Sequence, residues 1–125
     1  MIPGSAAPAV YVVDDDEAVR DSTQMVLQSY GMSVRTFSSG SAFLSEAADI
    51  PFGCVLLDQH MPEMNGIELL ETMRARGMTM PVIIITAKSG GSLKERALRA
   101  GASALLDKPV ADDDLIRAID AALPG

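Results

Sequence analysis

The chain has 125 residues, the size of one globular domain with a single core. Hydrophobic residues make up 48% and charged residues 22%, which excludes a disordered chain of low hydrophobicity. Lys and Arg number 10 against 17 Asp and Glu, and the net charge of -7 argues against direct binding of nucleic acids or anionic membranes. With 1 Cys and 1 His, the chain cannot build a disulfide framework or a Cys/His zinc site.

Short apolar runs of strand length recur along the chain. Continuous runs at 10–13, 54–57 and 82–85 are typical of parallel strands that helices cover on both faces. Residues 32–37 alternate in polarity and residues 104–106 form a shorter run, so both are predicted as edge strands. The run that contains Cys54 predicts a buried, reduced thiol, which suits a reducing cytoplasm.

Helical spacing of apolar residues fills the segments between these runs. Helices are predicted at 17–30, 40–48, 65–76, 92–100 and 112–123, and Gly31, Gly77 and Gly101 follow three of them as stop signals. Five strands alternating with five helices predict one α/β domain with a doubly wound parallel sheet. The predicted inward faces are Ala18, Ser22, Met25, Val26 and Ser29 in the first helix, Ile67, Leu70 and Met73 in the third, and Leu115, Ile116, Ile119, Ala122 and Leu123 in the last.

Polar residues follow the predicted strands at the point where each strand ends. Asp14 and Asp15 follow the first strand, Asp58 the third, Thr86 the fourth and Lys108 the fifth. In parallel α/β sheets the ligand site lies outside these carboxyl ends. Two carboxylates about 4 Å apart repel by about 4 kcal/mol at an effective dielectric of roughly 20. An ammonium and a hard divalent ion such as Mg²⁺ would compensate them, an arrangement that suits phosphoryl transfer.

Five short motifs occur in order along the chain. They are Val-Asp-Asp-Asp-Glu at 13–17, Leu-Asp-Gln-His-Met-Pro-Glu-Met-Asn-Gly at 57–66, Ile-Thr-Ala at 85–87, Ala-Gly-Ala at 100–102 and Asp-Lys-Pro at 107–109. Together they resemble the receiver domain of bacterial two-component response regulators, and within that family the FixJ type is most similar. The resemblance extends from about residue 10 to residue 123, and it implies a flavodoxin-like sheet with strand order 2-1-3-4-5 and five helices.

The resemblance also implies the roles of the strand-end residues. Asp58 corresponds to the phospho-acceptor, Asp14 and Asp15 to the acidic pair that binds Mg²⁺ with it, Thr86 to the switch hydroxyl and Lys108 to the lysine that contacts the phosphate. The backbone carbonyl of His60, two residues past the acceptor, corresponds to a further metal ligand. The implied function is to accept a phosphoryl group from a sensor histidine kinase and then change the surface at the fourth helix, fifth strand and fifth helix. Beyond self-phosphorylation and dephosphorylation, no enzymatic activity is implied.

Four further positions bear on this chemistry. The place in the fifth strand that often holds Tyr or Phe is Leu105 here, and the residue after Lys-Pro, often Phe, is Val110, so the usual coupling of aromatic and threonine is weakened. His60 and Lys88 lie two residues beyond the acceptor and the switch threonine. Both are bulky or cationic, and we expect them to shield the phosphoryl group from water.

Other functions fit single motifs. Asp14-x-Asp16 after an apolar run resembles the opening of haloacid-dehalogenase-like phosphatases, in which Asp14 would be the nucleophile, but that fold is larger and leaves Asp58 unused. A receiver fold that serves only as an unphosphorylated docking module is the third hypothesis. The acidic residues at 14–17 could also be a solvated strand end and the first turn of a helix.

The expected organisation is a flexible lead-in at 1–9 and one receiver domain at 10–125. The lead-in has no Lys, Arg or long apolar stretch, so a signal peptide is not predicted and a cytoplasmic location is expected. Besides the kinase, the expected partner is an output domain or downstream protein outside this chain. A phosphorylation-dependent dimer is compatible with the family, and neither nucleic acid nor membrane is an expected direct partner.

Overall fold

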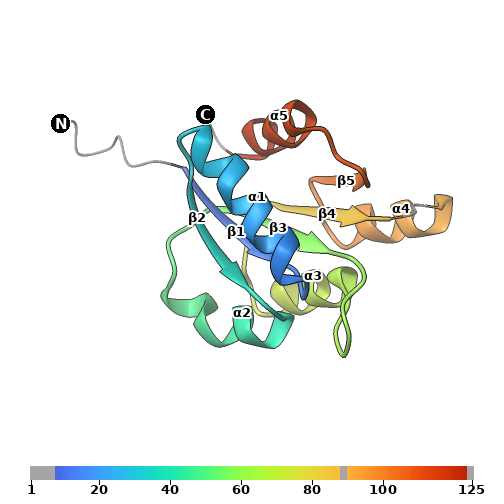
Figure 1. The fold of residues 1–125 in the computed structure, drawn as a ribbon. Helices are drawn as coiled ribbons and strands as arrows, with labels where there is room; N and C mark the ends of the chain where they lie inside the picture. Colours follow the sequence, from blue (N-terminus) through green and yellow to red (C-terminus); the bar gives the residue numbers. More distant parts are fainter. Residues whose placement is uncertain (1–7, 88–89, 124–125) are drawn as a thin grey trace.

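The computed structural model describes residues 8–87 and 90–123. Five parallel strands form one sheet in the order β2-β1-β3-β4-β5, which confirms the predicted doubly wound architecture (Figure 1). The strands are β1 (Ala9–Val13), β2 (Ser33–Phe37), β3 (Cys54–Asp58), β4 (Val82–Thr86) and β5 (Ala104–Asp107). The helices are α1 (Glu17–Ser29), α2 (Gly40–Glu46) with a 3₁₀ turn η1 (Ala47–Asp49), α3 (Gly66–Ala75), α4 (Gly91–Arg99) and α5 (Asp112–Ala122).

Burial along the strands follows their place in the sheet. All five residues of the central β3 are buried, whereas the edge strands β2 and β5 keep exposed or half-buried positions. This agrees with the predicted continuous and alternating patterns. Cys54 lies fully buried in β3, and burial raises the pKa of its thiol to about 12, so the thiol stays protonated at neutral pH.

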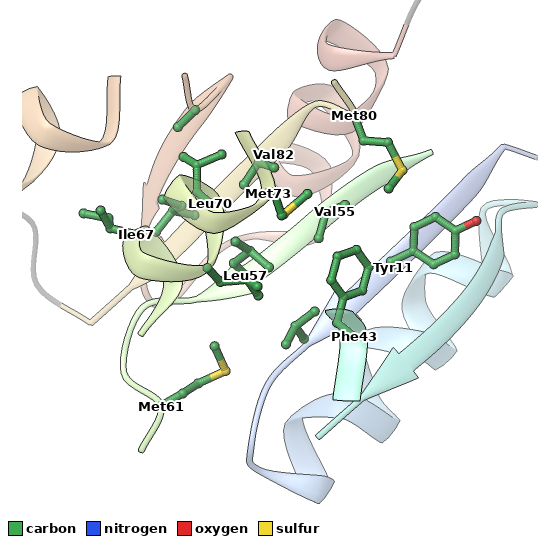
Figure 2. Packing of buried hydrophobic residues seen from close by; sticks show 14 of the residues in the cluster. Tyr11, Phe43, Val55, Leu57, Met61, Ile67, Leu70, Met73, Met80 and Val82 are labelled. Carbon is green, nitrogen blue, oxygen red and sulfur yellow. The ribbon is translucent and has the colours of Figure 1, made fainter. Parts of the chain in front are cut away.

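Each face of the sheet carries its own apolar core. Helices α2, α3 and α4 cover one face, where Tyr11 and Val13 point, while α1 and α5 cover the other, where Val10 and Val12 point. Alternate residues of one strand therefore serve two cores, as strand geometry requires. Figure 2 shows the first core, with α3 residues Ile67, Leu70 and Met73 beside Val55 and Leu57 of β3.

The inward faces of α3 and α5 are as predicted, but that of α1 is not. Met25 was expected to face inward but is 71% exposed. Ala18, Ser22 and Ser29, which were expected on the same inward face, are also exposed. The residue of α1 that is fully buried is Leu27. Residues 25, 26 and 27 are consecutive and apolar, and each is rotated by about 100° from the last, so packing against the sheet decides which one enters the core.

Local capping fixes where the helices near the functional edge begin. The Asp16 carboxylate accepts the backbone N–H groups of Ala18 and Val19 at the start of α1. Asn65 and Glu68 form a capping box at the start of α3. Among the residues that the structure describes, no helix is long and apolar enough to cross a membrane.

Candidate functional site

Three carboxylates meet at the carboxyl ends of β1 and β3. Asp14 and Asp15 directly follow β1, and Asp58 is the last residue of β3, which pairs with β1 in the register Val13 to Leu57. One oxygen from each carboxylate lies within 4.8 Å of the others. Asp14 and Asp58 are buried, whereas Asp15 is exposed. The structure therefore brings together the acidic residues that the sequence singled out.

The loop after β1 is held by several hydrogen bonds. The backbone N–H of Asp14 donates to the carbonyl of Phe37 at 3.1 Å, and its carboxylate accepts the Asp16 N–H at 2.9 Å. From α1, Arg20 Nη1 donates to the Asp14 carbonyl at 2.7 Å. The sequence analysis did not predict this role for Arg20. The signal that could have indicated it is the position of Arg20 in the first helix, six residues after Asp14. Together these bonds fix Asp14 before any ligand arrives.

Burial raises the pKa of the Asp14 carboxyl above its ordinary value of 3.8. The neighbouring charges of Asp58 and Asp15 raise this pKa further, while the Asp16 N–H and the Lys108 ammonium lower it. The three carboxylates therefore repel one another, and a bound cation would reduce this repulsion. Carboxylate oxygens are the donors that Mg²⁺ prefers, so the residues present fit the ion implied by the sequence motifs.

Lys108, which directly follows the edge strand β5, brings a positive charge to the carboxylates. Its Nζ lies 3.1 Å from Asp58 Oδ1, across 50 residues of sequence, and its side chain is 37% exposed against 6% for Asp58. The backbone N–H of Lys108 donates to the Thr86 carbonyl at 2.8 Å, and the Lys108–Pro109 peptide bond is cis. Asp58 is therefore flanked by the acidic pair and by one ammonium, as the sequence predicted.

Thr86 ends β4 with its side chain fully buried. His60, which is exposed on the loop after Asp58, places Nε2 3.2 Å from Thr86 Oγ1. The sequence predicted that both residues border the acceptor, but not that they touch each other. Lys88, the third residue expected there, lies outside the described residues.

The loop after β3 is built around Gln59, which sequence reasoning passed over. Its backbone N–H donates to the Ile85 carbonyl at 2.8 Å, and its side-chain Oε1 accepts the N–H of Ile67 at the start of α3. Gly66 lets this turn close, because a Cβ there would come within 3.0 Å of the Asp58 carbonyl. Gln59 directly follows Asp58, and this adjacency was the signal that could have marked it.

Leu105 is half-buried in β5, opposite Ile84 of β4, and packs against the core under α3 and α4. Val110 packs instead against the core under α1 and α5. No aromatic ring occupies either position, as the sequence shows. The packing contacts that the chain makes at these two positions are therefore aliphatic.

An open cavity of about 650 Å³ adjoins the acidic cluster. It lies between α1, α5 and the sheet, where Val26, Leu56 and Leu115 line its apolar part. Asp14, Asp58 and Lys108 line the same cavity, so the carboxylates are reachable from solvent through it. The buried Asp58 carboxylate can therefore be approached by a molecule that enters this cavity from solvent.

Comparisons with known proteins agree with this geometry. The family model described as the response regulator receiver domain matches residues 10–120. This chain belongs to the response regulator receiver domain family. It is thus a receiver of two-component signalling, and neither the phosphatase nor the pure docking module is favoured by the matches.

Among curated relatives, the receiver is 40% identical over 114 residues to the transcriptional regulatory protein FixJ of Bradyrhizobium diazoefficiens, covering 91% of this chain and 56% of that protein. It is 38% identical over 117 residues to the transcriptional regulatory protein TdiR of Thauera aromatica, covering 94% and 52%. The chain therefore spans about half the length of the curated relatives it matches.

Solved structures show the same fold. The crystal structure of FixJ-N superposes with a TM-score of 0.87 at 35% identity, covering 94% of this chain and 97% of that one. The chemotaxis protein CheY4 of Vibrio cholerae gives a TM-score of 0.88 at 27% identity, covering 94% and 100%. The FixJ-like resemblance and the flavodoxin-like topology inferred from the sequence are both confirmed.

Proposed function

We propose that this receiver accepts a phosphoryl group on Asp58 from a sensor histidine kinase, with Mg²⁺ bound. The observation that carries the proposal is the position of Asp58, which is buried between the acidic pair and the Lys108 ammonium at 3.1 Å. Phosphoryl transfer depends mainly on positioning and on neutralising charge on the moving oxygens. The flanking groups of Asp58 supply both.

In the proposed step an Asp58 carboxylate oxygen attacks the phosphorus of a phosphohistidine in line with its leaving nitrogen. The new P–O bond forms as the P–N bond breaks, and the imidazole leaves with the bonding electron pair. Lys108 neutralises charge near the attacked centre through its contact with Asp58. The same balance holds for an acyl phosphate, whose carboxylate is then the leaving group.

Asp14, Asp15 and Asp58 would hold the metal ion, together with the backbone carbonyl of His60. When bound, Mg²⁺ supplies positive charge to the phosphoryl oxygens. The hydrogen bonds that Asp14 makes to Asp16, Phe37 and Arg20 keep its carboxylate oriented toward that role. The carbonyl of His60 belongs to the loop that Gln59 anchors, which fixes its place relative to Asp58.

The switch is proposed to run from Asp58 to Thr86 and then to β5. Thr86 Oγ1 would engage a phosphoryl oxygen, and Leu105 would repack to change the surface of α4, β5 and α5. That surface would act on an output domain or downstream protein in the cytoplasm, and dimerisation is one form the response can take. The curated relatives named as transcriptional regulatory proteins support an output of gene control.

The test is incubation with Mg²⁺ and acetyl phosphate, followed by intact mass measurement. One phosphoryl adduct is expected on the parent protein and none on Asp58→Asn. Asp49→Asn is the matched control, because Asp49 is an exposed aspartate on η1 rather than at the acidic cluster. An adduct that persists undiminished in Asp58→Asn would overturn the assignment of the acceptor.

A further inference from the structure

The contact between His60 and Thr86 is a product of the sheet register. Asp58 of β3 pairs with Ile85 of β4, and the next residue, Gln59, donates its backbone N–H to the Ile85 carbonyl. His60 and Thr86 are the residues that follow on each side. Their side chains meet at 3.2 Å between Nε2 and Oγ1.

Both ends of this contact are held by the backbone. Thr86 is fully buried, and its carbonyl accepts the Lys108 N–H at 2.8 Å. On the other side, the Gln59 carbonyl accepts the Gly66 N–H, and the Gln59 side chain accepts the Ile67 N–H. The His60 ring therefore reaches Thr86 from an anchored loop.

The proposed switch requires the same hydroxyl. A threonine hydroxyl has one proton to donate, and its rotation sets where that proton points. If Thr86 donates to His60 Nε2, that proton is directed away from a phosphoryl oxygen on Asp58. If Nε2–H donates to Oγ1, the bond still holds the side chain in its present position. In the first case the hydrogen bond must break before Thr86 can donate to a phosphoryl oxygen, and in the second it restricts movement of the hydroxyl toward that group.

We propose that His60 is a positioning residue that restrains Thr86 in the unphosphorylated receiver and so sets how readily the switch engages. This inference rests on the proposed function, because it concerns the threonine of that same site. It differs from shielding of the phosphoryl group, since it acts through Thr86 and before phosphorylation. Removal of the hydrogen bond should favour the arrangement in which Thr86 meets the phosphoryl oxygens.

The test uses His60→Phe, which keeps the bulk of a ring but cannot form the hydrogen bond, and Thr86→Val, which keeps the shape of threonine without its hydroxyl. Affinity for beryllium fluoride with Mg²⁺, a phosphoryl mimic, is measured for the parent, both single variants and the double variant. His60→Phe should bind the mimic about two- to fivefold more tightly, the lower part of the range expected for one partly buried hydrogen bond. In the Thr86→Val background the same change should have no effect.

A second readout follows the His60 ring directly. His60 is the single histidine of the chain, so its imidazole ¹⁵N resonances are assigned without ambiguity. Thr86→Val should displace the Nε2 resonance in the unphosphorylated protein, and the fluoride mimic should displace it in the parent. Glu63→Gln, an exposed position on the same loop, is the control and should leave the mimic affinity as in the parent.

The outcomes separate the two proposals. An equal gain in affinity from His60→Phe with and without the Thr86 hydroxyl, or no gain at all, would overturn the restraint while leaving phosphorylation of Asp58 standing. An Nε2 chemical shift that is unchanged in Thr86→Val would also overturn the restraint. If the parent forms no adduct with acetyl phosphate, the proposed function fails, and the restraint fails with it.

Discussion

At the scale of single residues, the ionised carboxylate of Asp14 is the group at this site that burial disfavours. Its carboxyl is buried beside two other carboxylates, and burial is the main reason that its pKa is raised above 3.8. Between the pKa of the unfolded chain and the raised pKa of the folded one, the folded state binds more protons. Stability contributed by this group is therefore lost as pH rises through that window.

Asp14→Asn removes this penalty. We expect the variant without metal to have a free energy of unfolding higher by about 1 kcal/mol at neutral pH. Urea denaturation at pH 4 and pH 7 should show a smaller loss of stability with rising pH in the variant than in the parent. Asp49→Asn serves as the control, and a variant as pH-sensitive as the parent would show that the cost lies elsewhere.

The receiver resemblance leads us to expect that His60 and Lys88 lengthen the lifetime of the phosphoryl group, although Lys88 lies outside the described residues. Water must attack in line with the Asp58 oxygen, and bulk at the mouth of the site limits its approach. His60→Ala with Lys88→Ala should therefore speed dephosphorylation by about threefold or more at fixed Mg²⁺. Loss of ³²P label measures the rate, and an equal or slower rate in the double variant would remove shielding from the account.

At the scale of elements, α3 begins in close contact with the end of β3, which carries Asp58. Gly66 is its first residue, and a Cβ there would lie 3.0 Å from the Asp58 carbonyl and 3.1 Å from Gln59 Cα. Both neighbours are backbone atoms, so they cannot rotate away. The start of α3 is thus part of what places Asp58.

Gly66→Ala should destabilise the receiver by about 1–3 kcal/mol, as overpacking does elsewhere. The matched control is Gly91→Ala, at the first residue of α4, where a Cβ would meet nothing within 4 Å. We expect that control to stay within about 0.5 kcal/mol of the parent or to exceed it. Chemical denaturation of the two variants makes the comparison, and equal effects would contradict the role of close packing.

The strand β5 carries the expected surface change. Leu105 is half-buried and packs against the core under α3 and α4, and Thr86 of β4 pairs with Asp107 of β5. A spectroscopic change on phosphorylation should therefore depend on Thr86 and be largely lost in Thr86→Ala, while Leu105→Tyr should enlarge it. NMR shifts of α4 and β5 amides are the measurement. A change of full size in Thr86→Ala would exclude the threonine from the switch.

At the scale of the whole molecule, binding of a cation should stabilise the fold. The acidic cluster joins β1 to β3 at the centre of the sheet, and the chain carries a net charge of -7. A ligand that binds only the folded state adds stability by mass action.

Mg²⁺ at tenfold its Kd should raise the free energy of unfolding by about 1.4 kcal/mol and the Tm by about 5 °C. Asp15→Asn should lose most of this increment, because it removes the exposed carboxylate of the cluster. Thermal unfolding with Mg²⁺, at matched ionic strength with Na⁺ as control, measures both. An increment unchanged in Asp15→Asn would exclude this residue as a ligand.

The sequence by itself determined the strands, the sheet class and the candidate site. Apolar runs and their ends are local features, and in a parallel sheet every strand end arrives at one edge. That is why Asp14, Asp58 and Thr86 could be placed together from the chain alone. The stop at Gly31 was equally readable, because the residue has a φ of 85° that favours glycine.

Contacts between side chains were decided by the tertiary structure. The rotation of α1 that buries Leu27 and exposes Met25 depends on the whole sheet face beneath it. The contact of His60 with Thr86 needs the register between β3 and β4 and the anchoring of Gln59. Local patterns specify which residues come to an edge, whereas packing of distant segments sets their distances and orientations, and no short stretch of sequence contains that information.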